Sequence, residues 1–460
     1  MNFITPENVL GLPMEEYAKL LKLVDIFLAH QPKNYRKNRY YEGRIALGDV
    51  NLGIALPEGL AGLEIGCAWG AKCVDVLAGR SMFDGFVGVN GENVEELDNI
   101  VRANRLIAEY PKATRDELKL GATFATLSRD PDIGCKIRFH SAQTAAAVWD
   151  GNLGRIGYGM AIIDTATDNA TQTWSPSLVY LYTDTDVWVL RRAGNIWTAD
   201  RYPQKMGRPL MEPLIWNATS DKPFGRSRIK EPVRRLIDCY VRTIANATIG
   251  LEFATSPQKY LLGVTDDQYD AVINQKFRQY VGSIIASTVN PETGEKPTFG
   301  QLQQGTIAPH VEMVRMLATQ FSAATGLSVT DTGVVNDANP SSSDAILAQS
   351  QTLVAMAEQL NTGNGDSLRN IGIMAQAIAE DKRPDELEDY QRDIVAHFKN
   401  PAMPSVAMTA DAAIKIASAR PAFASTDTFL EMIGFDQADI RRIRAQETRA
   451  RGLAVLNEVL

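Results

Sequence analysis

Cysteine and histidine are scarce in this chain of 460 residues, and neither type is grouped. Four cysteines and four histidines are spread along the whole sequence. Zinc and related metals need several Cys or His ligands at close, regular spacing. We therefore expect core or surface roles for these residues, no metal site, and a reducing compartment for the unpaired thiols. The residues are Cys67, Cys73, Cys135, Cys239, His30, His140, His310 and His397.

The common catalytic motifs are also absent. The sequence contains no Gly-x-x-x-x-Gly-Lys-[Ser/Thr] phosphate loop, no Gly-x-Ser-x-Gly and no His-Glu-x-x-His. We expect no catalytic residue, no cofactor and no enzymatic activity. The glycine-rich residues 151–159 follow no clear strand and open no helix, so a hairpin turn is the better interpretation.

A basic excess is lacking as well. The chain has 55 acidic residues against 47 Lys and Arg, a formal net charge of −8. Proteins that grip duplex DNA by neutralising phosphates are usually basic. This balance argues against tight, static DNA binding and leaves open a protein that DNA passes without sticking.

Long apolar runs are missing too. Residues 14–28 are the most apolar stretch near the start, but charged residues recur through them at helical spacing. This pattern indicates an amphipathic surface helix, and we expect no leader peptide and no membrane span.

The patterns that are present indicate an α+β chain. Helical periodicity occurs at residues 15–29, 70–77 and 94–108. From residue 121 to 197 the chain carries short runs of β-branched and aromatic residues between turn residues. We expect an antiparallel sheet packed on the preceding helices.

The second half is mainly helical. Prolines at 209, 213 and 223 hold a connector extended, and Gly225 releases it into a basic helix over 226–252. Pro232 either kinks that helix or marks its true first turn. A second helix is expected over 308–325, stopped by Gly326.

Further helices are expected after a polar loop at 327–339. They cover residues 344–360 and 368–379, separated by the polar stretch 361–366, and a mixed-charge helical tail covers 427–460.

Residues 35–44 are basic and aromatic. One interpretation is a solvated helix end whose tyrosines pack on the body. Another is nucleic-acid contact through stacking and cations.

Residues 63–72 resemble the cofactor loop of S-adenosylmethionine-dependent methyltransferases. That loop has an acid followed by closely spaced glycines, as Glu64, Gly66 and Gly70 are here. However, Asn90 stands where an acid should end the second strand, and no run of alternating strands and helices follows. A methyltransferase is therefore the alternative hypothesis.

Five weak motifs occur in the order typical of another family. They are Tyr-Tyr-Glu-Gly at 40–43, Trp69 with Val-Asp-Val-Leu-Ala-Gly-Arg at 74–80, Asn217 with Gly-Arg-Ser-Arg-Ile at 225–229, Ser-Pro-Gln at 256–258, and Asn-Pro-Ser-Ser-Ser-Asp-Ala-Ile at 339–346. Together they resemble the portal proteins of tailed bacteriophages, of the siphophage type. A head–tail adaptor or minor capsid protein is a further alternative, but such proteins are normally shorter.

The resemblance implies a portal fold, mainly helical with a β-rich wing and a small α/β clip. The implied regions are the wing (1–224), first stem helix (225–252), clip (253–305), second stem helix (306–326), tunnel loop (327–343), tunnel helix with return to the wing (344–400) and C-terminal crown (401–460).

The resemblance also implies a dodecameric ring at one capsid vertex, present in the virion and, during assembly, in the host cytoplasm. The implied partners are the terminase large subunit, the head–tail adaptor, the major capsid and scaffolding proteins, and double-stranded DNA that passes without sequence specificity.

Three groups of site residues follow from the resemblance. Tunnel-loop residues facing DNA are Thr330, Asp331, Thr332, Asn336, Asp337 and Asn339; stem and subunit contacts are Arg226, Arg228, Arg234, Arg235 and Arg242; the clip's partner surface is Asp266, Asp267, Glu292, Glu295 and Lys296. The loop at 327–339 has no Lys or Arg. In a ring even one lysine becomes a belt of charge that would hold phosphates.

Overall fold

The first helix is longer than expected. Helix α1 (Met14–Glu42) presents Leu20, Leu23 and Phe27 to the core at helical spacing, and Gly43 caps its C-terminal end. Its second half contacts the body through the Asn34 side chain, which donates a hydrogen bond of 3.0 Å to the Ala142 carbonyl. The computed structural model describes residues 9–46, 48, 64–89, 94–168, 173–194, 196–255, 259–262, 294, 296, 298–301, 306–334, 343–402, 406–435 and 437–459.

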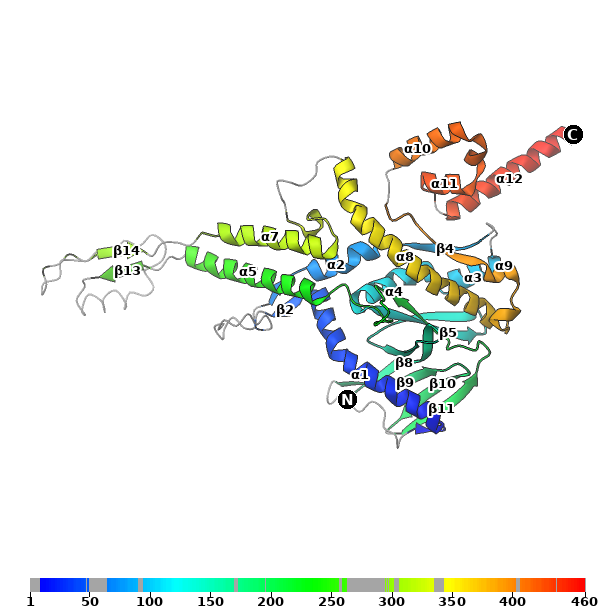
Figure 1. Ribbon diagram of the computed structural model, residues 1–460, viewed down its shortest axis with the longest axis horizontal. Helices are drawn as coiled ribbons and strands as arrows, with labels where there is room; N and C mark the ends of the chain where they lie inside the picture. Colours follow the sequence, from blue (N-terminus) through cyan, green and yellow to red (C-terminus); the bar gives the residue numbers. More distant parts are fainter. Residues whose placement is uncertain are drawn as a thin grey trace.

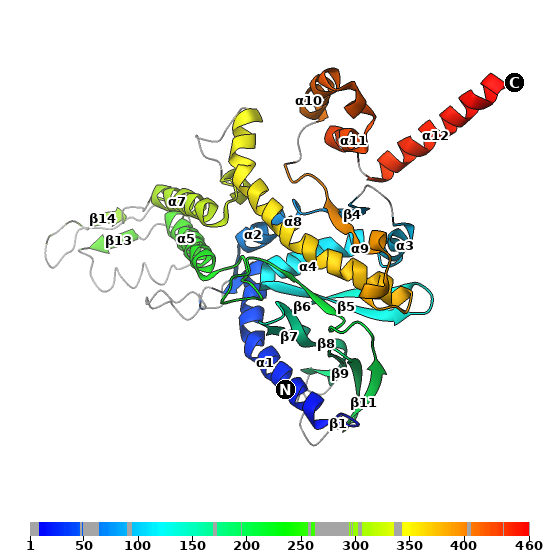
Figure 2. The same cartoon turned by 45° about the vertical axis from the view of Figure 1, so that its right-hand side comes forward.

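Helix α1 packs on a six-stranded sheet, as Figure 2 shows. The sheet has the order β1-β11-β10-β9-β8-β7, in which β1 pairs parallel with β11 and the other neighbours are antiparallel. The expected strand-rich region and the turn within 151–159 are confirmed. The strands are β1 (Val9–Leu10), β7 (Ala145–Asp150), β8 (Arg155–Asp168), β9 (Thr173–Tyr182), β10 (Asp186–Ala193) and β11 (Ile196–Pro203).

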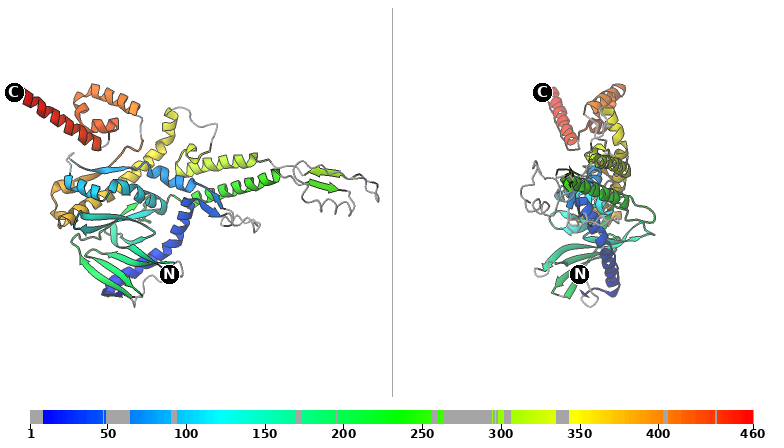
Figure 3. Two further views of the ribbon diagram at one scale, coloured as in Figure 1. Left: turned by 180° about the vertical axis from the view of Figure 1, so that it is seen from behind. Right: turned by 90° about the vertical axis from the view of Figure 1, so that its left-hand side faces the viewer.

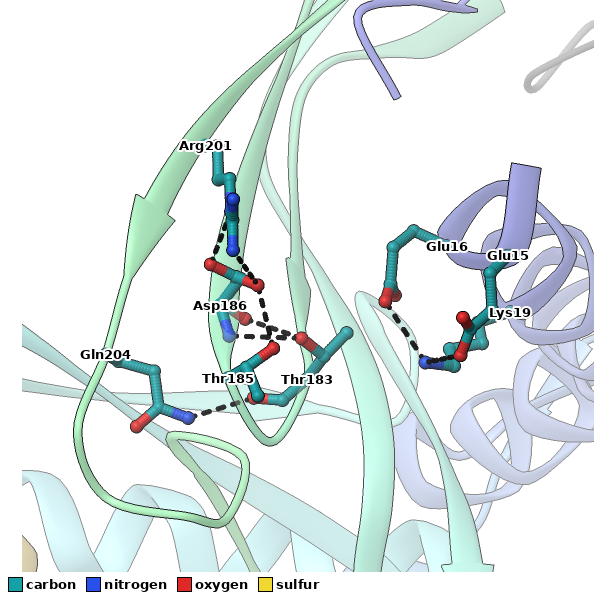
Figure 4. A network of polar contacts seen from close by, with 8 residues as sticks. All are labelled: Glu15, Glu16, Lys19, Thr183, Thr185, Asp186, Arg201 and Gln204. Atoms are coloured by element: carbon teal, nitrogen blue, oxygen red, sulfur yellow. Dashed lines mark hydrogen bonds and ion pairs between the residues drawn. The ribbon is translucent and has the colours of Figure 1, made fainter. Parts of the chain in front are cut away.

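A polar network closes one end of this sheet (Figure 4). The Asp186 carboxylate accepts hydrogen bonds from Arg201 at 2.7 and 3.2 Å and from the Thr185 hydroxyl at 2.7 Å. The bond from Arg201 is the main reason that the pKa of Asp186 lies below its ordinary value. The Gln204 amide donates to the Thr183 carbonyl at 3.1 Å, so the network joins β10, β11 and the segment after β11.

A second layer contains a three-stranded sheet, β12-β5-β6, with helix α4 packed on it. The expected helix at 94–108 is in fact two helices. They meet at Asn104, whose buried amide group donates to the Cys135 carbonyl at 2.8 Å and accepts from the Ile137 N–H at 2.9 Å. These bonds to β6 turn the chain there, and Arg105 takes a left-handed backbone conformation. The elements are α3 (Glu95–Ala103), α4 (Leu106–Leu120), β5 (Ala122–Asp130), β6 (Gly134–Ser141) and β12 (Met211–Ile215).

Helix α8 (Ser343–Ala379) crosses this layer as one continuous helix. The break expected at 361–366 was wrong. The Asn364 side chain is fully buried and donates hydrogen bonds to the Tyr110 hydroxyl at 3.0 Å and to the Glu117 carboxylate at 2.8 Å. These contacts with α4 hold a sequence of turn-forming residues in helical conformation.

Two long helices project from the body side by side (Figures 1 and 3). Helix α5 (Glu231–Thr255) begins later than the expected start at Arg226, with Pro232 in its first turn, so Pro232 marks the helix start. Helix α7 (Ala308–Thr325) has the expected bounds and ends at Gly326. Strands β13 (Lys259–Leu262) and β14 (Thr298–Gln301) pair antiparallel beyond their outer ends.

The remaining elements precede α3 or follow α7 in the chain. Among the described helices none is both long and apolar enough to cross a membrane. The C-terminal helices lie on the same side of the body as the N-terminal end of α8 (Figure 1). The elements are β2 (Arg44–Ala46), β3 (Glu64–Gly66), α2 (Trp69–Ala78), β4 (Phe83–Gly88), the short turns η4 (Thr330–Thr332), η5 (Pro384–Glu386) and η6 (Pro421–Ser425), α9 (Asp389–Arg392), β15 (Ile394–Phe398), α10 (Val406–Ala419), α11 (Asp427–Ile433) and α12 (Gln437–Val459).

Candidate functional site: the root of the projecting helices

Trp69 stands where the two projecting helices join the body. Its ring lies 4.5 Å from the ring of Tyr240 on α5 and 4.9 Å from that of Phe321 on α7. Its indole N–H donates a 3.2 Å hydrogen bond to the Thr332 carbonyl in η4. Trp69 is nearly fully buried, so one side chain fixes both helices and the turn that follows them. We call this region the root.

Two tyrosines at the end of α1 bind the root through their hydroxyl groups. Tyr40 donates to the Asp238 carboxylate at 2.7 Å, and Tyr41 donates to the Asp75 carboxylate at 2.9 Å. Burial is the first cause that raises the pKa of both phenols, to about 12 for Tyr41. The interpretation of residues 35–44 as a helix end with tyrosines packed on the body is therefore confirmed for this pair.

Two glycines are required by close backbone approaches in the root. A Cβ atom at Gly70 would lie 2.0 Å from the Tyr40 carbonyl oxygen, so only glycine lets α2 start against the end of α1. Gly225 has a φ of 65°, and a Cβ there would lie 2.1 Å from the Trp216 carbonyl oxygen. The segments that the motifs mark are thus packed backbone against backbone.

Arg228 is buried at the centre of the root. Its Nε donates to the Cys73 carbonyl at 2.6 Å, and its Nη2 donates to the Thr325 carbonyl at 2.7 Å. The guanidinium also lies over the ring of Trp216, 5.7 Å from the ring centroid. Arg228 thus joins α2, the last turn of α7 and the connector. Arg228 was expected among the stem and subunit contacts, and its side chain is buried inside the chain, where it contacts α7.

The other stem arginines are more accessible. Arg226 precedes α5 and lies 3.5 Å from the Asp221 carboxylate. On α5, Arg234 donates to the Ile229 carbonyl at 2.8 Å, Arg235 lies 3.5 Å from the Glu231 carboxylate, and Arg242 is half-buried. These residues leave donor groups on the surface of the first helix.

The first part of the expected tunnel loop is an ordered turn. Its Asp331 carboxylate accepts hydrogen bonds from the Ser328 N–H at 3.0 Å and the Ser328 hydroxyl at 2.7 Å. Thr330 is exposed, and the Thr332 carbonyl is held by Trp69. Asn336, Asp337 and Asn339, expected in the same loop, lie outside the described residues.

The expected partner surface at the tip is described at one position. Lys296 is exposed and precedes β14. The other four positions lie outside the described residues. They are Asp266, Asp267, Glu292 and Glu295.

Residues 64–72, which were compared with a methyltransferase cofactor loop, lie in a different fold from that loop. Strand β3 pairs antiparallel with β2, and α2 then runs into the root. A doubly wound parallel sheet is absent from the part of the chain that the structure describes, where only β1 and β11 pair parallel. Within the same residues no group of His, Cys, Asp or Glu could hold a metal ion.

Several root residues were missed by sequence reasoning. Asp238 carries no local signal, and the motif at 74–80 does not indicate what Asp75 binds, because the partners Tyr40 and Tyr41 are distant in the chain. The cationic pattern at 226–242 drew attention to an outward face, although Arg228 points inward. For Arg228, the available signal was its place in the motif Gly-Arg-Ser-Arg-Ile at 225–229.

Comparison with known proteins gives the family. The model of the family described as "Phage portal protein, SPP1 Gp6-like" matches residues 24–452. No curated protein matches the chain significantly.

Two of the solved structures to which the chain is similar are of gene transfer agent particles. The chain is 12% identical to a chain from the virion of a native gene transfer agent particle, with a TM-score of 0.47, 80% of this chain covered and 89% of the other. It is also 12% identical to a chain from the neck of the native particle computed with C12 symmetry, with a TM-score of 0.46 and the same two coverages. On the family match, which spans most of the sequence, the chain belongs to the phage portal proteins of the SPP1 Gp6-like family.

Proposed function

We propose that copies of this chain form a dodecameric ring at one capsid vertex, through which double-stranded DNA passes without sequence specificity. The observation that carries this proposal is the projecting pair α5 and α7, fixed to the body at one root, with the paired strands β13 and β14 beyond its far end. A rigid arm of this kind, repeated around an axis, forms the wall of a tube.

The regions take their roles from this arrangement. The body with its sheets is the wing, α5 and α7 are the stem, and the strand pair β13–β14 belongs to the clip. The clip meets the terminase large subunit during packaging and the head–tail adaptor afterwards. The wing and the C-terminal crown meet capsid and scaffolding proteins in the host cytoplasm and then in the virion. ATP hydrolysis belongs to the terminase.

The turn after α7 is our candidate for the channel lining. Thr330 is exposed there, and the 327–339 segment contains no cation. Neutral and acidic side chains release phosphates readily, which suits a surface that DNA must slide past. Arg226, Arg234, Arg235 and Arg242 are then left for contacts on the outside of the stem or between subunits.

Electron microscopy of the purified chain tests the ring. We expect negatively stained particles with a central hole and a single rotational order. Particles that stay monomeric at high concentration, with scaffolding and capsid proteins added, would contradict the proposal. Calorimetry with S-adenosylmethionine tests the alternative, and we expect no saturable heat.

A further inference from the structure

A hollow of about 320 Å³ lies between the end of α1, strand β2 and the first turns of α5. Figures 1 and 3 show these elements meeting beside the stem. Side chains from all three elements line it, and most of them are cationic. The lining arginines are Arg36, Arg39, Arg44, Arg234 and Arg235.

Among the described residues that line the hollow, the arginines outnumber the carboxylates. The lining carboxylates are Glu231 and Asp238. Asp238 accepts the Tyr40 hydroxyl at 2.7 Å. Glu231 is 3.5 Å from Arg235, and both side chains are about two-thirds exposed, so this ion pair is weak. Even with Arg39 left out, four arginines stand against two carboxylates among the described lining residues. This excess of positive charge lies in a concave site, which concentrates its field.

The pKa of a neighbouring lysine is affected by one of these arginines. Lys37 on α1 donates a 2.7 Å hydrogen bond to the Leu120 carbonyl. Its pKa is lowered to about 8, first by burial and then by the charges of Arg234 and Lys33. An anion in the hollow would relieve this repulsion.

We propose that the hollow binds carboxylate side chains of a second copy of this chain. Guanidinium groups match carboxylates in planar, two-bond geometry, and a hollow of this size admits a few side chains. The chain supplies carboxylates in excess, 55 against 47 basic residues. The inference rests on the ring proposed above, because a ring places another copy beside every stem.

Duplex DNA is the less suitable occupant. In a ring the hollow is repeated in every subunit, so arginines that faced the channel would form several cationic sites around the DNA. Six to ten phosphate contacts change DNA affinity by about 10³-fold or more over modest salt changes. Such a surface would hold DNA rather than let it pass.

Charge reversal in the hollow tests the proposal. We expect R36E/R235E to raise the concentration at which rings assemble by about tenfold or more, measured by sedimentation velocity and mass photometry. The control R191E/R383E makes the same change in net charge at two exposed arginines away from the hollow, and we expect wild-type assembly. Circular dichroism and thermal unfolding establish that both variants fold.

Three outcomes would overturn the proposal. They are wild-type assembly of R36E/R235E, an equal loss of rings in both variants, and normal rings of R36E/R235E that have lost affinity for duplex DNA. Failure of the wild-type chain to form rings would instead remove the proposed function on which the inference rests.

A second measurement does not depend on the folding of a double variant. A photoreactive side chain in place of Arg235 is activated in assembled rings, and the products are mapped by mass spectrometry. We expect cross-links to an acidic segment of another copy. Cross-links only within one chain would contradict the proposal.

Discussion

The Arg228 guanidinium is enclosed where α2, α7 and the connector meet, and it hydrogen-bonds two backbone carbonyls from distant segments. We expect Arg228→Ala to lower the free energy of unfolding by roughly 3 kcal/mol, because both carbonyls lose a charged donor in a buried place. Urea unfolding followed by tryptophan fluorescence measures this.

The matched control is Arg226→Ala. Arg226 is partly exposed and lies 3.5 Å from an exposed carboxylate, so we expect a change within about 0.5 kcal/mol. Equal losses for the two variants would show that Arg228 does not hold the root together.

Glu117 makes stability depend on pH in an unusual direction. Burial raises its pKa from 4.5 to about 8, so between these values the folded chain binds a proton that the unfolded chain has lost. Stability therefore falls as pH rises through this window, with a slope of up to about 1.4 kcal/mol per pH unit. We expect Glu117→Gln to flatten the fall, measured as the midpoint of thermal unfolding from pH 5 to 8.5.

Glu380→Gln is the control for this pH series. The pKa of Glu380 is lowered, mainly by a hydrogen bond from Lys382, so its contribution is lost only when pH falls below its ordinary pKa. We expect the wild-type slope between pH 5 and 8.5. If Glu117→Gln also kept the wild-type dependence of stability on pH, Glu117 would not be its cause.

At the scale of elements, α2 can reach α1 only because residue 70 has no side chain. We expect Gly70→Ala to cost several kcal/mol or prevent folding, since its Cβ would overlap the Tyr40 carbonyl. Gly66→Ala should be nearly neutral, because nothing lies within 4 Å of its Cβ. Soluble yield and thermal unfolding distinguish the two, and a stable Gly70→Ala chain would disprove this packing.

The sequence pattern predicted correctly those helices whose ends are determined by residues close to them in the chain. Helix α7 begins with a proline in its first turn and ends at Gly326, and its bounds were predicted correctly. The break expected within α8 and the single helix expected over α3 and α4 were wrong. In both places a buried asparagine decides the outcome: Asn364 keeps a helix intact, and Asn104 ends one. Their partners lie far away in sequence, so no local pattern contains this information.

The candidate site was predictable only in part. The motifs marked the correct segments, because Tyr40, Trp69 and Gly225 all lie in the root. Their contacts could not be predicted, because Trp69 meets Tyr240 and Phe321 only after the chain has folded.

At the scale of the assembled ring, a substitution in the turn after α7 tests whether DNA passes this turn without binding to it. Thr330→Lys adds one cation per subunit at an exposed position, and in a ring these cations act together. We expect rings of this variant to bind linear duplex DNA at least about a hundredfold more tightly at low salt, with a steeper salt dependence. Fluorescence anisotropy measures this affinity between about 50 and 200 mM salt. Over that range, several phosphate contacts change the affinity for DNA strongly.

Thr198→Lys supplies the control for DNA binding. Thr198 is exposed on β11, in the sheet that lies away from the projecting helices. We expect wild-type DNA binding from these rings. If both lysines raised the affinity for DNA equally, the turn after α7 would not be a lining of the channel.

The root also fixes an order of events as the chain is made. Its contacts join Trp69, near the start, to Phe321, and Arg228 to Thr325, and both of these partners lie far along the sequence. The strands between residues 122 and 215 can pair as soon as they leave the ribosome, but Trp69 and Arg228 lack their contacts with Phe321 and Thr325 until α7 is complete. A subunit therefore gains a firmly attached arm late in synthesis, after most of its body has formed.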